Sequence, residues 1–404
     1  MEQAGERGGQ ALETVSRMRS ATRMDRIQAP IIAVIGGLIR EVPGTISLGQ
    51  GVVHYGPPTA AIDAVRSALV DPATHEYNDG AGLPVLVAAI TKKLKSENGI
   101  DVSRGCQVMV TAGANMAFVH AVFATTSPGD EVILPVPFYF NHEMAIEMAG
   151  CRAVRVPTDD QYQLRLDAIE AAITPRTRAV VTISPNNPSG AVMSEGSLRA
   201  INRLCAERGL YHIADEPYEY FTYGSARHVS PGSFEGAEQH TISLYSLSKA
   251  YGFAGWRIGY AVYPDHLAAA MIKSQDTVLI CPTIAAQIGA AAALNVGREY
   301  CEPHVRELSS IRDIVVDKLS ALGSLATVPT AAGAFYCLLR VHVDVPPMQV
   351  AERLIREHKV AVIPGTAFGM MEGCYFRVAY GALQKDTVTE GIGRLVDGLR
   401  KICG

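Results

Sequence analysis

Residues 243–260 read SLYSLSKAYGFAGWRIGY, and the interpretation of the whole chain starts from this stretch. It begins as a β-rich run and passes through two hydroxyl side chains, Ser246 and Ser248, to Lys249, with Arg257 eight positions further on. A lysine amine forms an imine with an aldehyde, and a serine hydroxyl with a planar guanidinium binds a phosphate. Most lysines in an S-x-S-K sequence are solvated, but the apolar and glycine residues around this one favour burial. The stretch therefore predicts a site for an aldehyde cofactor that carries a phosphate.

The segment between about residue 58 and residue 300 alternates short β-rich runs with longer helical patterns. The β-rich runs are nearly continuous in Val, Ile, Leu and Ala, which is typical of strands buried on both faces of a largely parallel sheet. Repeated strand, helix, strand units predict an α/β doubly wound domain. The predicted strands include 106–113, 130–137, 178–185, 210–217 and 241–248, and the predicted helices include 85–98, 115–126 and 194–208.

The pattern changes after about residue 300. A long charged helix is followed by short strands and a final helix, which indicates a smaller α+β domain. The predicted elements here are helix 299–322, strands 333–340 and 375–381, and helix 385–402.

A chain of 404 residues is too long for one simple core, so we expect two unequal domains. Residues 1–23 are expected to form a flexible arm, and YGPP at 55–58 reads as a turn into the large domain. The predicted division gives residues 58–298 to the large domain, and residues 24–57 together with 299–404 to the small domain.

The composition argues against several classes of protein. A net charge of -4 and a pI near 6.3 give no basic surface for nucleic acid or for an anionic membrane. No apolar stretch is long enough to span a bilayer, and the first residues lack an apolar signal core. The eight cysteines form no C-x-x-C pair, so we expect reduced thiols, no metal site and a cytoplasmic protein.

Other polar residues also follow predicted strands, where open α/β sheets bind their ligands. Asp215 in IADEPYEY reads as a helix N-cap or as a carboxylate that keeps a pyridine nitrogen protonated. An ion pair near 4 Å contributes roughly 4 kcal/mol at an effective dielectric of about 20, enough to raise a pyridinium pKa. Asn187 in SPNNPSG reads as a turn residue or as a donor to a phenolate oxygen.

Three further positions suit an anionic, aromatic ligand. In TAGANMAF, a glycine turn opens a helix, so the N–H groups of Ala114 and Asn115 can bind a phosphate. Among the aromatic residues of PVPFYFNHEM, which are mostly expected in the core, Tyr139 is the one predicted to stack on a heterocycle. Arg377 lies in the otherwise apolar YFRVAYG and needs an anionic partner, such as a substrate carboxylate, if it is buried.

Together these motifs resemble the fold-type I pyridoxal 5'-phosphate (PLP) enzymes, specifically the class I/II aminotransferase family (aspartate/aromatic aminotransferase-like). The resemblance runs from about Ile46 to the C-terminus. The motifs occur in the family order: GQG (49–51), HEYNDGAGLP (75–84), TAGAN, PFY, NNPSG, DEPY, SLSK with Arg257, PTAAGAFY (329–336), VIPGTAFG (362–369) and FRVAYG.

The resemblance implies a role for each matching residue. Lys249 would carry the imine with PLP and move the proton, with Asp215 and Tyr218 completing the catalytic set. The implied cofactor-binding residues are Gly113, Ala114, Asn115, Tyr139, Asn187, Asp215, Tyr218, Ser246, Ser248, Lys249, Arg257 and Tyr77, and the implied substrate-binding residues are Gly51, Asn187 and Arg377. Tyr77 matches a tyrosine that reaches the phosphate of the neighbouring subunit, so the resemblance implies a homodimer with a shared active site.

The chain departs from the family beside the first glycine. The family often reads G-E-P-D-F, whereas this chain has Gly51-Val52-Val53-His54-Tyr55. We expect this segment to border the substrate side-chain pocket. GQGVVHYGPP and PFYFNHEM are similar to a branch that includes aromatic and methionine aminotransferases.

The resemblance thus implies transfer of the amino group of an aspartate, aromatic or methionine-like L-amino acid to a 2-oxo acid such as 2-oxoglutarate. A PLP lyase or oxidase built on the same scaffold is the alternative, because fold alone does not dictate the reaction. A non-catalytic regulator is disfavoured, because the N-terminal stretch is too short for a DNA-binding segment. A nicotinamide dehydrogenase, a zinc peptidase and an α/β-hydrolase all lack their motifs here.

Overall fold

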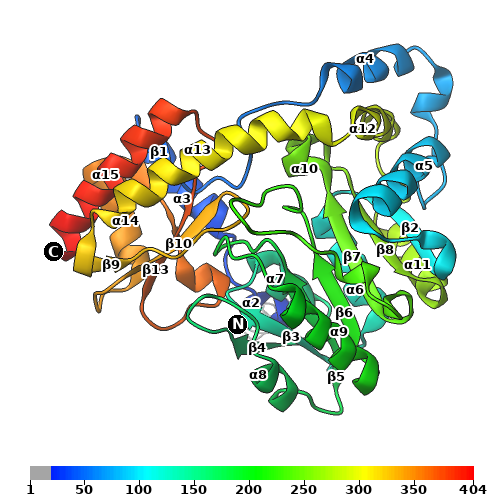
Figure 1. The fold of residues 1–404 in the computed structure, drawn as a ribbon, viewed down its shortest axis with the longest axis horizontal. Helices are drawn as coiled ribbons and strands as arrows, with labels where there is room; N and C mark the ends of the chain where they lie inside the picture. The colour runs from blue at the N-terminus through cyan, green and yellow to red at the C-terminus, as the bar shows by residue number, and fades with distance from the viewer. Residues whose placement is uncertain (1–19) are drawn as a thin grey trace, which may run out of the picture.

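The computed structural model describes residues 20–404, and its centre is a seven-stranded sheet (Figure 1). All neighbouring strands of this sheet run parallel except β8, which is antiparallel to both β2 and β7. The strand order is β2 (Cys106–Thr111), β8 (Gly259–Pro264), β7 (Thr241–Ser246), β6 (Tyr211–Asp215), β5 (Thr177–Ile183), β3 (Glu131–Val136) and β4 (Arg152–Pro157).

The prediction of a mostly parallel α/β sheet is confirmed. The five predicted strands correspond to β2, β3, β5, β6 and β7. Two strands of this sheet, β4 and β8, were not among the predicted strands. β4, with sequence RAVRVP, lies at the sheet edge, and Arg152 and Arg155 interrupt its apolar residues. β8, with sequence GYAVYP, is fully buried but directly follows the lysine and arginine motif and was taken as part of it.

Helices cover both faces of the sheet, because successive side chains of each strand point to opposite sides. Val132 and Leu134 of β3 belong to the core shared with α6, α7 and α11, whereas Ile133 faces α8 and α9. The helices of this domain are α4 (Thr59–Ala68), α5 (Pro84–Lys93), α6 (Ala114–Thr125), α7 (Phe140–Met148), α8 (Leu166–Ala171), α9 (Glu195–Arg208), α10 (Leu247–Ala250), α11 (Ala268–Val278) and α12 (Ile284–Val296).

The C-terminal part of the chain forms a second, smaller sheet of four antiparallel strands. Their order is β12 (Ile363–Pro364), β13 (Cys374–Ala379), β10 (Tyr336–Val341) and β9 (Ala326–Thr327). The accompanying helices are α13 (Cys301–Ser320), α14 (Pro347–His358) and α15 (Lys385–Cys403). In Figure 1, α13 runs from the large sheet to the small one.

Residues before the large sheet pack on this smaller unit. β1 (Ile46–Ser47) pairs in parallel with β11 (Val360–Ala361), and α3 (Ile31–Glu41) contributes Ile35 to a core with Ile355 of α14. The division between residues 24–57 with 299–404 and residues 58–298 stays a prediction. Most of the predicted arm, residues 1–19, lies outside the described residues, and its end enters the short helix α2 (Thr22–Asp25).

The two units share an aromatic core. Phe335 lies edge-on to both Tyr218 and Phe221, with ring centroids 5.4 Å apart in each pair. The backbone reinforces this contact, because Thr222 forms a β-bridge with Gly333. The segment after β6 is therefore held between both sheets, at the edge where the predicted polar residues lie.

All eight cysteines carry free thiols, as predicted. Among the helices of residues 20–404, none combines the length and the apolar character needed to cross a membrane.

His212, in the middle of β6, is a fully buried base. Asn202 Nδ2 donates to its Nδ1 at 3.0 Å, which leaves Nε2 to donate to Thr182 Oγ1 at 2.8 Å. A second proton, on Nδ1, would face the N–H of the Asn202 amide. Burial, with a smaller contribution from His240, lowers the pKa of His212 from 6.5 to about 3. The ring is thus neutral in the folded protein over the whole range in which an unfolded histidine titrates.

This pKa shift predicts a loss of stability in mild acid. Between the folded and the unfolded pKa only the unfolded chain binds the proton, so the free energy of unfolding falls as the pH drops below 6.5. From pH 7 to pH 5 the contribution of His212 should fall by about 2 kcal/mol. Urea unfolding at both pH values measures it. His212→Leu should be less stable at pH 7 but lose correspondingly less on acidification, and an unchanged pH dependence would contradict the assignment.

Candidate active site

A cavity of about 210 Å³ opens at the carboxyl ends of β5, β6 and β7, between the two units. Nearly all the residues predicted to form a site line this cavity. They are Gly51, Ala114, Asn115, Tyr139, Asn187, Asp215, Tyr218, Ser246, Ser248, Lys249, Arg257 and Arg377. The sheet therefore gathers side chains from distant parts of the sequence at one edge.

Lys249 lies in α10, a single turn that follows β7 directly. The turn begins where the Ser246 side chain accepts a hydrogen bond from the N–H of Ser248 at 3.1 Å, a side-chain N-cap. The amine of Lys249 donates to the carbonyl of Gly51. The pKa of Lys249 is lowered from 10.5 to about 8, chiefly by burial and then by the cations Arg377 and Arg257, while Asp215 opposes the shift. The lysine is therefore a base that can lose its proton near neutral pH.

Asp215 ends β6 and is 5% exposed. Its Oδ2 lies 3.1 Å from Nε2 of the buried His142, whose ring stacks on Phe118 at 4.0 Å. Its other oxygen, Oδ1, is buried and accepts no hydrogen bond from the residues that the structure describes. One carboxylate oxygen is thus held by the protein while the second remains available to a donor in the cavity.

A cationic end of the cavity forms where β2 turns into α6. Gly113 has φ +81°, and a Cβ added there would lie 2.5 Å from Nη2 of Arg257, so only glycine allows the guanidinium to come this close. Arg257 donates to the carbonyls of Ala254 at 2.8 Å and Ala112 at 3.3 Å. The first N–H groups of α6, at Ala114 and Asn115, face the same cavity, and such helix N-termini bind anions.

Arg377 forms a second cationic end from the small sheet. It is 2% exposed and donates to Asn187 Oδ1 at 2.9 Å and to the carbonyl of Gly49 at 2.7 Å. Its Nε is buried and has no partner among the described residues. Because Asn187 accepts from Arg377 through its oxygen, its amide Nδ2 is free to donate into the cavity.

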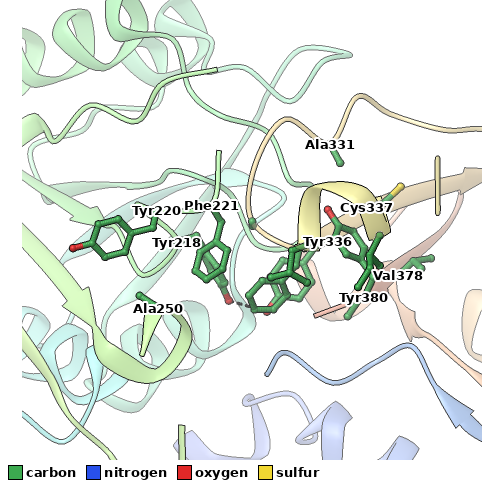
Figure 2. Packing of buried hydrophobic residues seen from close by; sticks show 14 of the residues in the cluster. Tyr218, Tyr220, Phe221, Ala250, Ala331, Tyr336, Cys337, Val378 and Tyr380 are labelled. Carbon is green, nitrogen blue, oxygen red and sulfur yellow. Dashed lines mark hydrogen bonds between the residues drawn. The ribbon is translucent and has the colours of Figure 1, made fainter. Parts of the chain in front are cut away.

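Two tyrosine hydroxyls meet between these ends. Tyr218 OH and Tyr336 OH lie 2.8 Å apart (Figure 2), and burial raises the pKa of Tyr218 well above its usual value. Burial also raises the pKa of Tyr139 to about 12. Its hydroxyl accepts from Asn141 Nδ2 at 2.9 Å. These phenols therefore stay protonated and can act as hydrogen-bond donors.

Two predicted site residues do not line the cavity of this chain. Gly113 lies directly behind Arg257, as described above. Tyr77 is 81% exposed and lies away from it. The expectation for the segment after Gly51 also needs correction, because residues 52–55 are not among the lining residues. Within this segment, Tyr55 contacts His304 of α13 and His54 contacts Glu307 of α13.

The structure adds seven lining residues that the sequence reasoning missed: Ile32, Gln50, Phe140, His142, Ile183, Pro217 and Tyr336. Most stand inside motifs that had been recognised, beside the residue that was chosen from each. Ile32, on α3, belongs to no motif, and only tertiary packing brings it to the site. Within residues 20–404, no group of three His, Cys, Asp or Glu side chains is arranged to hold a metal ion.

Comparisons with known proteins agree on one family. The family model described as aminotransferase class I and II matches residues 43–395. Aromatic aminotransferase ISS1 of Arabidopsis thaliana is 36% identical over 92% of this chain and 94% of its own length. Aspartate aminotransferase of Pyrococcus abyssi is 32% identical over 95% of this chain and 99% of its own. The solved structure of a single mutant of Thermus thermophilus aspartate aminotransferase matches with a TM-score of 0.87 at 31% identity, covering 95% of this chain and all of that one.

The lowered pKa of Lys249 predicts selective labelling in the protein without ligand. Reductive methylation requires a neutral amine, so the rate at Lys249 should rise up to about pH 8 and then level off. Peptide mass spectrometry measures this rate, with surface lysines of the same sample as the internal control. In Arg257→Leu, which removes one neighbouring cation, the midpoint should move upward. A rate at Lys249 that keeps rising to pH 10 would contradict the shift.

Proposed function

The chain belongs to aminotransferase class I and II, and on this basis we propose that it holds PLP in the cavity at the end of β6 and transfers amino groups there. The donor is an L-amino acid of the aspartate, aromatic or methionine-like type, and the acceptor is a 2-oxo acid such as 2-oxoglutarate. The observation that carries the proposal is the position of Lys249 between two cationic ends of one cavity, with Asp215 beside it.

The residues fit a flat pyridine ring that carries a phosphate. Asp215 has a buried oxygen without a donor, which suits a protonated ring nitrogen. Arg257 lies against Gly113 at the N-terminus of α6, which suits a phosphate. The carboxylate of Asp215 balances only part of the positive charge of Lys249, Arg257 and Arg377, which favours anionic ligands.

Each end of the cofactor would have its own set of contacts. Ser246, Ser248, Arg257 and the first N–H groups of α6 would bind the phosphate, and Tyr139 would stack on the ring. Asn187 Nδ2 and Tyr218 OH would donate to the ring oxygen. When bound, PLP supplies an electron sink that stabilises negative charge at the substrate Cα.

The protein's own groups would orient the substrate and move its proton. The Arg377 guanidinium, with its unpaired Nε, would bind the substrate carboxylate. This fixes the Cα of the substrate on the side of Lys249. With a pKa of about 8, Nζ of Lys249 is basic enough to take the Cα proton and acidic enough to return it. Asp215, held by His142, keeps its charge directed at the ring nitrogen.

The exposed position of Tyr77 supports a shared active site in a homodimer. Tyr77 is 81% and Val70 85% exposed, and clustered apolar exposure of this kind is typical of surfaces that bind a partner. Further exposed apolar side chains lie nearby in sequence or at the end of α11: Leu69, Val85, Val278, Leu279 and Ile280. The two segments touch, because Gln275 donates to the carbonyl of Gly80. We propose that this apolar surface binds a second copy, whose cavity receives Tyr77.

The amino-group transfer can be followed by absorbance. The PLP-loaded protein should show a visible band that bleaches when a donor amino acid is added alone and returns when 2-oxoglutarate is added. A panel of aspartate, aromatic amino acids and methionine would identify the donor, and Lys249→Ala should show no such cycle. A band that persists while ammonia or free oxo acid accumulates would indicate elimination or oxidation, and no band at all would contradict PLP binding.

The shared site predicts complementation between two inactive variants. Tyr77→Ala and Lys249→Ala should each have little activity at limiting PLP. Mixed dimers would contain one site with both residues intact, so co-refolding equal amounts should restore about one quarter of the unaltered activity. Size-exclusion chromatography checks that all samples are dimers. No recovery in a dimeric mixture would show that Tyr77 acts within its own subunit or not at all.

A further inference from the structure

The turn that carries Lys249 ends in carbonyl groups that need donors. α10 spans only Leu247–Ala250, so its last carbonyls have few partners within the helix. The Tyr55 hydroxyl donates to the carbonyl of Lys249 at 2.9 Å and lies 3.4 Å from that of Ala250. The thiol of Cys301 lies 3.1 Å from the carbonyl of Ala250. Two residues outside the large sheet therefore cap the turn of the lysine.

The backbone beside Tyr55 also presses on this turn. Gly252 follows α10 with φ +67°, and a Cβ there would lie 2.6 Å from the carbonyl carbon and oxygen of Gly56 and 2.7 Å from the carbonyl oxygen of Tyr55. The glycine thus permits main chain to pack directly on main chain. A shift of residues 55–56 would be transmitted to Lys249 without passing through a flexible side chain.

On its other side, Tyr55 rests on α13. Its ring stacks on that of His304, with centroids 3.7 Å apart and planes 8° from parallel. His54 Nε2 lies 3.3 Å from Glu307 Oε2, and the Tyr300 hydroxyl donates to the carbonyl of Gly56. Because α13 runs from the large sheet to the small one (Figure 1), the same helix contacts both the turn of the lysine and the small unit.

We propose that Tyr55 is a positioning residue for Lys249: its hydroxyl fixes the backbone carbonyl of the lysine, and the His304 ring on α13 fixes Tyr55. The position of α13 thereby sets the position of the amine in the cavity. This inference rests on the proposed function of Lys249. Tyr55 stands where the G-E-P-D-F pattern has phenylalanine, and His54 where it has aspartate.

The protonation state of Tyr55 supports this role. Burial raises the pKa of its hydroxyl far above the usual value, and the nearby Cys301, Tyr300, Tyr223 and Glu307 raise it further. The hydroxyl therefore keeps its proton and remains a donor at neutral pH.

The test compares Tyr55→Phe with Tyr300→Phe. Both remove one phenol oxygen from the same cluster, but only the first removes the contact to Lys249. In Tyr55→Phe, amide hydrogen exchange in residues 247–253 should become about two- to ten-fold faster, the range expected for one hydrogen bond. The kcat should fall by a similar factor with little change in KM, and the isotope effect of a Cα-deuterated donor should rise. Tyr300→Phe, which leaves the contact of Tyr55 to Lys249 in place, should change each of these less.

Each outcome of this comparison decides the proposal. Exchange and isotope effect at the level of the unaltered protein in Tyr55→Phe would overturn it, as would equal changes in Tyr300→Phe. His304→Ala, which removes only the stacking ring, should accelerate the same exchange to a smaller extent, and no acceleration would remove α13 from the proposal. If the unaltered protein fails to transfer amino groups, the proposed function fails, and the exchange data then still report on the contact to Lys249.

Discussion

Four charged side chains, those of Asp215, Lys249, Arg257 and Arg377, line one cavity, and the structure depends on how the enclosed ones are compensated. Transferring a charge from water into a protein destabilises the fold unless hydrogen bonds or an opposite charge replace the lost solvation. Asp215 is held by His142, Arg377 by Asn187 and a carbonyl of residue 49, and Lys249 by the carbonyl of Gly51. These partners come from both units of the chain. The site is therefore complete only when the two units are packed against each other.

The amino-acid sequence carries most of this arrangement. Strands that are nearly continuous in apolar residues, such as VILPV in β3 and AVVTI in β5, are typical of strands covered on both faces, so these runs predict a buried parallel sheet together with its ligand-binding edge. Gly113 before α6 and Arg377 in its apolar strand are informative for a similar reason. A glycine is unfavourable in a regular element unless another group must approach its backbone closely, and a buried arginine destabilises the fold unless it has a polar or anionic partner.

The remainder depends on contacts that no local pattern records. His142 stands in an aromatic stretch that also reads as core, and only the approach of α7 to the end of β6 pairs it with Asp215. Ile32 reaches the cavity because α3 packs on the small unit. For the same reason the segment after Gly51, predicted at the substrate pocket, contacts α13 instead. Edge strand β4 was missed because charged residues interrupt its apolar pattern.

The antiparallel strand β8 has a further consequence. It pairs Gly259 with Ser246 on one side and with Thr111 on the other, which aligns the ends of β7 and β2 with the start of β8. Residues 247–258 therefore form a connection of fixed length, with the amine of Lys249 near one end and Arg257 near the other. Surface connections usually tolerate insertions and deletions. Here a change of one residue in length would alter the distance between amine and guanidinium, so evolution can vary the side chains of this connection far more readily than its length.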